Sequence, residues 1–266
     1  MTVYPKLYFM IMAKEARRFF IYRGNIFAGC ITGLLMLAAR YALWRALFAA
    51  GTPQNATLAE TMTFFVITDL LLIWFSANYS DTIGTDIRSG DISLRLLRPF
   101  PYHMQLTASF HAGALTSTLT RALPMLTAAV IFIGLLGPVS PSAFTFFIIA
   151  AFMGWIINSL VDLIISYSAF WLTEFWYIRW FKNALFMMFG GIVLPIWFYP
   201  QWLQTVSSFL PFQFAVFVPI GIYLGRVPQS EIGFLLLMQL FWIALLFVAE
   251  RALWRLAQNK IVVQGG

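Results

Sequence analysis

Long runs of apolar residues are the feature that most constrains how this chain can fold. Several of them reach the ~20 residues that a helix needs to cross the hydrocarbon core of a bilayer. Of the 266 residues, 61% are hydrophobic and only 10% are charged, whereas an ordinary soluble domain is about 25% charged. One soluble core cannot hide so much apolar surface. The sequence therefore predicts an all-α integral membrane protein, folded as a single transmembrane domain over residues 1–266.

Six segments are expected to be transmembrane helices. They cover residues 25–48, 58–80, 104–136, 143–172, 183–199 and 231–254. Lys and Arg residues gather before the first segment, after the second and fourth, and after the last, whereas the loops 49–57 and 137–142 contain none. Basic loops remain on the cytoplasmic side of a membrane. The net charge of +7 therefore indicates topology and not nucleic-acid binding, and both termini are expected in the cytoplasm.

The first 23 residues have the pattern of an amphipathic helix. Leu7, Met10 and Ile11 share one face of it. A helix with an apolar face and a basic face lies along the membrane surface and does not cross it. The stretch has no cleavage site typical of a secretory signal, so we expect it to be retained. The basic face of this interface helix comprises Lys14, Arg17 and Arg18.

Residues 200–226 are apolar, but Pro211 and Pro219 interrupt them. A proline inside a helix removes a hydrogen bond and clashes with the preceding turn, so one straight span is not expected here. Two short re-entrant helices, which dip into the membrane and return, agree better with the pattern. Such a broken backbone is tolerated only where protein buries it.

Residues 81–102 form a charged segment between two apolar runs, and its centre reads DIRSGDISLRLLRPF from Asp86 to Phe100. Gly90 permits a sharp bend, and Pro99 and Pro101 end any helix that precedes them. We therefore expect a short amphipathic helix exposed to the cytoplasm. One interpretation is a solvated connector that binds anionic headgroups. The other is a protein-binding surface, where opposite charges set the register and leucines fill a groove.

The stretch IRSGDISLRLLRPF resembles the cytoplasmic loop of ABC-2 type permeases, the membrane subunits of prokaryotic ABC exporters. The motifs YRGN before the first span, LPFQFAVFVPIGIYLG before the last, and QGG at the end agree with it. The resemblance implies that the loop is a coupling helix, seated in a groove of a separate ATPase subunit, and that the N-terminal helix contacts the ATPase nearby. The expected coupling residues are Asp86, Arg88, Gly90, Asp91, Leu94, Arg95, Leu96 and Leu97.

The same resemblance implies ABC ATPase subunits as partners, a second permease that is either an identical copy or a related protein, and a location in the bacterial inner membrane among lipids. The re-entrant helices would lie on the outer side. The chain itself has neither a G-x-x-x-x-G-K-[ST] phosphate loop nor a G-x-G-x-x-G motif. ATP and Mg²⁺ are therefore expected on the partner subunit, and no cofactor is expected on this chain.

Ionisable residues inside the expected spans are costly and mark either ion pairs or functional sites. Arg40 and Asp69 have matching depths, which favours a structural pair over a functional acid. The depths of Arg121 and Asp162 match less well, but the two side chains are expected to be within reach of each other. Gly29 and Gly33 form a G-x-x-x-G motif, which predicts a close helix crossing and has dimerisation as one of its uses.

Two other functions remain as alternatives: a membrane-embedded enzyme that modifies lipids, and a scaffold that transports nothing. An enzyme would need acids, bases or metal ligands gathered at one depth. His103 and His111 are eight residues apart without an H-E-x-x-H motif, and Cys30 is the single cysteine. No catalytic residue and no metal site is therefore expected. The family resemblance and the apolar spans with few charges favour export of a hydrophobic or amphipathic compound.

Overall fold

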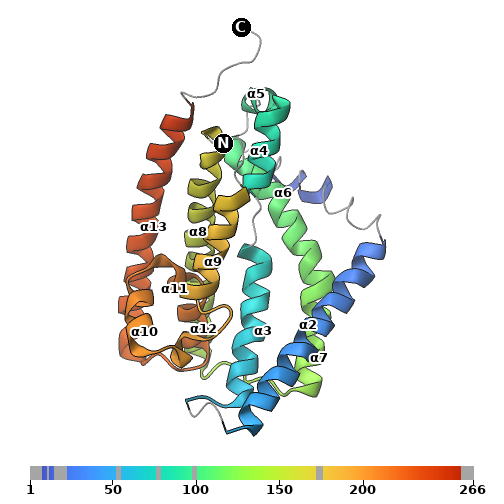
Figure 1. Ribbon diagram of the computed structural model, residues 1–266, viewed down its shortest axis with the longest axis vertical. Coiled ribbons are helices and arrows are strands. Elements are labelled where there is room, and N and C mark those ends of the chain that lie inside the picture. Colours follow the sequence, from blue (N-terminus) through green and yellow to red (C-terminus); the bar gives the residue numbers. More distant parts are fainter. Residues whose placement is uncertain are drawn as a thin grey trace.

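The long axis of the molecule is set by a bundle of long helices. A computed structural model describes residues 8–10, 12–14, 23–51, 55–75, 79–97, 101–171 and 176–258, and these contain helices and loops but no strand. Figure 1 shows the long helices running between two ends of the bundle. They are α2 (Arg23–Ala49), α3 (Leu58–Phe75), α8 (Pro141–Ser166), α13 (Gln229–Gln258) and the continuous rod of α6 (Tyr102–Ser117), η1 (Thr118–Ala122) and α7 (Leu123–Phe132).

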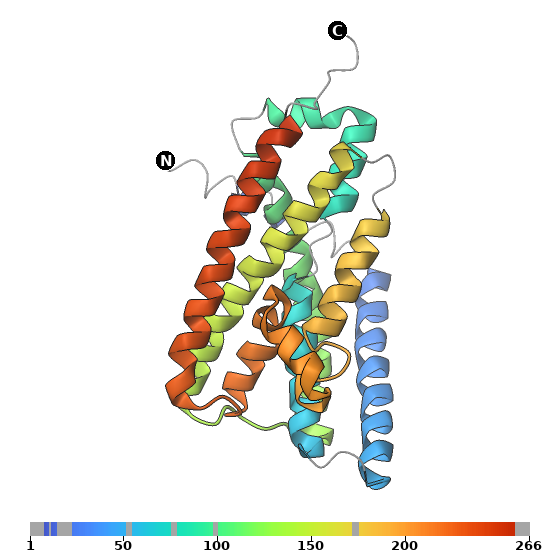
Figure 2. The same cartoon turned by 60° about the vertical axis from the view of Figure 1, so that its left-hand side comes forward.

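Five helices in the described part of the chain are long and apolar enough to cross a membrane. They are Ile26–Ala49, Leu58–Phe75, Met104–Phe132, Pro141–Ser166 and Gln229–Ala257. Each corresponds to one of the expected spans, so the prediction of an all-α membrane protein is confirmed. α13 packs along α8, and Figure 2 shows the two side by side.

The span expected at residues 183–199 has wrong boundaries. The helix there is α9 (Trp176–Phe189), which has 14 residues and a length of about 21 Å at 1.5 Å per residue. It ends because Gly191 adopts a φ of 73° and Pro195 follows soon after. The apolar run continues beyond that turn, so composition alone gave a longer helix than the backbone allows.

The core lies around α3, which stands in the middle of the bundle (Figure 1). Met62, Phe64 and Phe65 of α3 are fully buried. The ring of Phe64 meets the ring of Trp197 edge-on, with centroids 4.9 Å apart. Lipid tails are as apolar as leucine, so close packing of this kind, and not the hydrophobic effect, holds helices together in a membrane.

Residues 200–226 form three short helices, where two were expected. They are α10 (Gln201–Ser208), α11 (Pro211–Ala215) and α12 (Phe217–Tyr223). The backbone breaks at Val216, and the freed carbonyl oxygen of Phe214 accepts a hydrogen bond of 2.7 Å from Gln239 of α13. Protein therefore buries the broken backbone, as a membrane protein requires.

The G-x-x-x-G motif of α2 serves a contact inside the chain. A Cβ atom at Gly33 would lie 2.9 Å from Cγ of Arg121, and one at Gly29 would lie 3.3 Å from Oγ1 of Thr120. The thiol of Cys30 donates a hydrogen bond of 2.8 Å to the carbonyl oxygen of Thr120. The close crossing that the motif predicted is thus made with η1 of the same chain, and this surface of α2 is not free for dimerisation.

Candidate functional site

The charged segment forms two helices at one end of the bundle. α4 (Tyr79–Ser89) and α5 (Asp91–Leu96) meet at Gly90, whose φ of 78° gives the sharp bend that the sequence predicted. Figure 1 shows α5 at the end of the bundle opposite to the turn between α2 and α3. The side chain of Ser89 donates a hydrogen bond of 2.9 Å to Asp91, which begins α5.

Asp86 is the internal anchor of these two helices. It is only 3% exposed. Its carboxylate accepts a hydrogen bond of 2.7 Å from the hydroxyl of Tyr102 and lies 3.1 Å from the guanidinium of Arg95. Gln105 of α6 also donates a hydrogen bond of 3.1 Å to the carbonyl oxygen of Arg95. Asp86 therefore positions α5 from within, because its buried carboxylate faces Tyr102 and Arg95.

Burial, reinforced by the hydrogen bond to Asp86, raises the pKa of Tyr102 above its ordinary value. Tyr102 consequently keeps its proton at neutral pH and remains the donor in this bond. A carboxylate with two such partners is satisfied although it is buried. The bend at Gly90 and the anchor at Asp86 together determine which face of α5 points outward.

The outward face of α5 is apolar. Leu97 is 81% exposed and Leu94 64% exposed, and Leu96 lies beside them at the surface. Ile92 of this helix turns inward, into a buried cluster with Ile83 of α4. Exposed leucines grouped on a rigidly held helix outside the spans are typical of a protein-binding surface.

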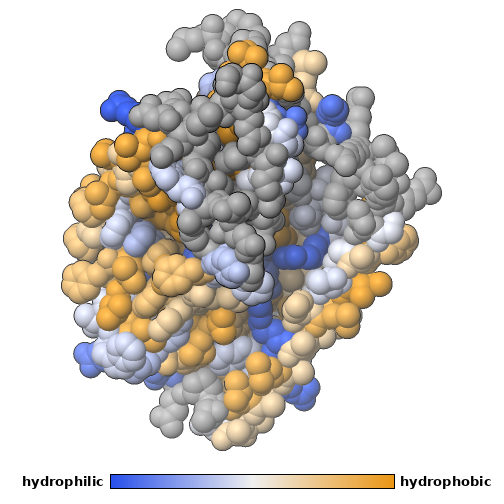
Figure 3. Space-filling view, turned by 45° about the horizontal axis from the view of Figure 1, so that its top comes forward, coloured by the Kyte–Doolittle hydropathy of each residue, from blue (hydrophilic) through white to orange (hydrophobic). Residues whose placement is uncertain are grey.

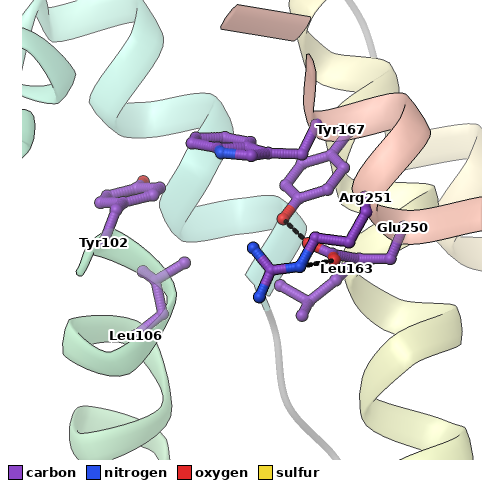
Figure 4. A pocket seen from close by; sticks show the side chains of 7 residues that line it. Tyr102, Leu106, Leu163, Tyr167, Glu250 and Arg251 are labelled. Carbon is purple, nitrogen blue, oxygen red and sulfur yellow. Dashed lines mark hydrogen bonds and ion pairs between the residues drawn. The ribbon is translucent and has the colours of Figure 1, made fainter. Parts of the chain in front are cut away.

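The support of the charged segment extends to α8 and α13 (Figure 4). The hydroxyl of Tyr167, at the start of η2 (Tyr167–Phe170), donates a hydrogen bond of 2.7 Å to Glu250 of α13. Arg251 lies 3.5 Å from the same carboxylate, and Trp254 packs against the ring of Tyr167. The cavity among these residues is about 10 Å³. That is room for about one water molecule at most, so the side chains of this cluster pack against one another and join the helices.

A second group of charges lies inside the spans. Nη1 of Arg40 on α2 lies 2.6 Å from Oδ2 of Asp69 on α3, and the structure thus brings together the two residues matched by depth. The guanidinium of Arg40 also lies over the ring of Phe65, 4.6 Å from its centroid. Arg121 of η1 attracts the same carboxylate of Asp69 at longer range.

Asp162 does not pair with Arg121, and that expectation is corrected. Its carboxylate on α8 is bound by Lys182 of α9, and both residues are buried. Asn158, one turn earlier on α8, donates a second hydrogen bond to Asp162, of 3.3 Å. The expected fifth span began at residue 183, one residue after Lys182, and Lys182 was therefore counted among the basic residues after the fourth segment. Its spacing of four residues from Phe186 on α9 was the signal that it belonged to a helix.

Several expected residues fall partly or wholly outside the described residues. Arg17 and Arg18 of the interface helix lie outside them, and only the backbone of Arg88 is described. Residues 8–10 and 12–14 are helical, with Lys14 exposed. The hydroxyl of Tyr8 forms a hydrogen bond with Nδ1 of His111.

No metal centre is present among the residues that the structure describes, because no three His, Cys, Asp or Glu side chains there come close enough to share an ion. An apolar cavity of about 470 Å³ lies within the bundle. Its walls come from α3, α7 and α8, with Thr118 of η1 at one side and Tyr223 at another. Its size is in the range of sites for small organic molecules.

Comparison with known proteins gives one family. The family model described as ABC-2 family transporter protein matches residues 25–265, which is almost the whole chain. Among curated proteins, none matches this chain.

Proposed function

The chain belongs to the ABC-2 family of transporter proteins, whose members are membrane permeases without an ATPase of their own. From that premise we propose that it exports a substrate and that ATP hydrolysis on a separate subunit drives the export. The observation that carries this proposal is the outward face of α5, with Leu94 and Leu97 exposed and Asp86 buried beneath them. Because α5 is held in this way, a movement of the partner against α5 is transmitted to the spans behind it.

The partner fits the chemistry of that surface. An ATPase groove lined by apolar residues would bury the leucines, and a basic residue at its rim would meet Asp91, which is exposed. Motion of α5 then reaches α6 through Tyr102, which binds Asp86, and through Gln105, which binds the backbone of Arg95. It reaches α8 and α13 through the buried cluster that contains Tyr102, Leu163 and Tyr167.

The orientation in the membrane is part of the proposal. The α5 end and both termini face the cytoplasm of a bacterial inner membrane, because the basic loops lie at that end. α9 and the chain that follows it provide the sixth crossing, and α10 to α12 enter from the outer side and return. In a Cys30→Ala background, a cysteine at Ser142 should react with an impermeant label added outside, and a cysteine at Ser89 should not. The reverse pattern would refute the orientation.

The assembly is proposed to contain two permeases, either two copies of this chain or one copy with a related chain, and two ATPases. The interface helix over residues 1–23 would lie beside the ATPases. The central test is co-purification of the ATPase with the permease. Leu97→Asp and Leu94→Asp should each weaken ATPase binding at least about tenfold, because a charge on the docking face must be buried against an apolar groove.

Ser142→Asp is the matched control for this test. It adds the same charge at an exposed site at the other end of the bundle, so ATPase binding should remain at the level of the unchanged chain. Asp91→Lys separates docking from headgroup anchoring, because a lipid anchor is strengthened by an added lysine whereas a docking surface is weakened. Normal ATPase binding by Leu97→Asp and Asp91→Lys together would refute the proposed docking surface.

A further inference from the structure

Three charged residues from three different spans meet at one depth. They are Arg40 of α2, Asp69 of α3 and Arg121 of η1. Counted from the ends of their helices at Ala49, Leu58 and Phe132, each lies about 14 to 17 Å into the membrane at 1.5 Å per residue. The hydrocarbon core is about 30 Å thick. The cluster is therefore at the middle of the bilayer, where charge is most costly.

The charges of this cluster do not balance. Arg40 holds the carboxylate of Asp69 directly, at 2.6 Å. Arg121 shares that carboxylate only at longer range, and no other described carboxylate lies within ion-pair distance of it. Asp162 is taken by Lys182. Among the described residues, two guanidinium groups thus face one carboxylate, which leaves one positive charge without a described counter-charge at the depth where a counter-charge is most needed.

The backbone around Arg121 is built to bring its side chain to this place. Residues Thr118–Ala122 form a π-helical turn, a rare distortion that is frequent at functional sites. Gly33 opposite it has no side chain, and this allows the stem of Arg121 to lie against α2. Arg121 is nevertheless only half-buried. Figure 3 shows hydrophilic side chains gathered in a hollow between two apolar parts of the surface.

Two sources of the missing anion are disfavoured. A second copy of this chain would bring Asp69 at this depth, and Asp69 is already paired with Arg40. Its Asp162 is paired with Lys182 and lies four residues from the end of its span at Ser166, about 6 Å at 1.5 Å per residue. A resident lipid holds its anionic headgroup at the membrane surface, about 15 Å from the midplane of a core that is about 30 Å thick. A molecule that passes through the membrane is the remaining source, since its polar group must cross this depth.

We propose that Arg121, assisted by Arg40, binds the anionic group of the transported molecule, so that the substrates are anionic amphiphiles. This inference rests on the proposed transport function and adds the substrate class to it. The hydrocarbon part of such a molecule has the apolar cavity of about 470 Å³ close by. Thr118, from the same π-helical turn as Arg121, and Leu70, the neighbour of Asp69 in sequence, both line that cavity.

The test measures binding to the purified full-length chain in nanodiscs of neutral phosphatidylcholine, without any ATPase. The probes are radiolabelled oleate and oleyl alcohol, which have the same chain and differ in charge. Oleate should bind at least about tenfold more tightly than oleyl alcohol. Arg121→Gln should abolish this difference. Arg121→Lys should keep it, and so should the control Arg45→Gln, which changes an exposed arginine on α2, the helix that carries Arg40.

Asp69→Asn provides a test in the opposite direction. It frees Arg40 and leaves two unpaired guanidinium groups, so oleate should bind several-fold more tightly and should raise the melting temperature of this variant more than that of the unchanged chain. This result is decisive even if Arg121→Gln does not fold. Weaker or unchanged oleate binding by folded Asp69→Asn would overturn the proposal, as would an unchanged preference for oleate in folded Arg121→Gln.

A third arm identifies the source of the anion. Phosphatidylglycerol added to the nanodiscs should not displace oleate, because its headgroup stays at the surface. Full displacement would show that a resident lipid supplies the anion and would overturn the assignment to a transported molecule. A related permease that supplies an acid to Arg121 would abolish oleate binding when it is co-purified with this chain. That result would also overturn the assignment to a transported molecule. Since no ATPase is present, failure here leaves the docking test on α5 unaffected.

Discussion

The hydroxyl of Tyr102 on α6 donates a hydrogen bond of 2.7 Å to Asp86 on α4, and the two residues join the charged segment to a transmembrane rod. Asp86 comes from the segment that would meet the ATPase, and Tyr102 begins the helix that continues through η1 to α7. The bond therefore lies on one path of contacts between the docking face of α5 and the rod that carries Arg121.

Tyr102→Phe is predicted to loosen this path. It removes one of the two partners of a buried carboxylate, and the cost should be about 1–3 kcal/mol of unfolding free energy. Thermal melting of the purified permease measures that cost. In the complete transporter, the ATPase should still bind, but its hydrolysis should respond less to substrate. Asp91→Asn is the control, because this exposed carboxylate should change stability by less than about 0.5 kcal/mol.

The crossing of α2 and η1 gives a second prediction. Gly33→Ala places a Cβ atom 2.9 Å from the side chain of Arg121 and 3.1 Å from its carbonyl oxygen. The helices must separate, which should cost about 1–3 kcal/mol. Gly24→Ala is the matched control, because its Cβ atom meets nothing within 4 Å.

Melting temperatures of the two alanine variants decide this second prediction. If Gly33 serves dimerisation instead, Gly33→Ala should lower the dimer fraction on size exclusion and leave the melting temperature of the monomer equal to that of Gly24→Ala. That outcome would contradict the intramolecular crossing.

The buried pair of Lys182 and Asp162 gives a third prediction. Lys182→Met or Asp162→Asn alone leaves one charge buried without its partner, at a cost of about 3–5 kcal/mol. The double variant should recover most of the lost folded yield, because no charge then remains. Folded yield after detergent extraction measures the effect. A double variant that is as poor as the worse single variant would show that the pair does more than neutralise charge.

The sequence predicted the family and five of the long helices because apolar runs and loop charges are local signals. The structure places Arg40 and Asp69 in contact. They lie on consecutive spans, so their depths in the membrane could be matched by counting residues from the turn that the two spans share. Lys182 was missed because its depth depends on where α9 begins, and that start is not marked by hydropathy. The inward direction of Asp86 was also beyond the sequence, since it depends on Tyr102 from the next helix.

The break between α11 and α12 leads to the last prediction. Gln239 of α13 is fully buried, and its side-chain amide donates hydrogen bonds of 2.7 Å to the carbonyl oxygen of Phe214 and 2.9 Å to that of Ala150. Inside a bilayer no water can replace such a donor. Gln239→Leu should therefore cost about 1–3 kcal/mol for each acceptor left unsatisfied.

The loss of stability should be local, because the backbone of α11 and α12 has no other break of this kind within their described residues. Hydrogen exchange should accelerate at residues 211–217 in Gln239→Leu while the middle of α3 stays protected. Gln229→Leu, at the exposed start of the same helix, is the control and should change neither region. If exchange at residues 211–217 is the same in both variants, Gln239 does not hold the broken backbone, and the proposed re-entrant arrangement of α10 to α12 loses its main support.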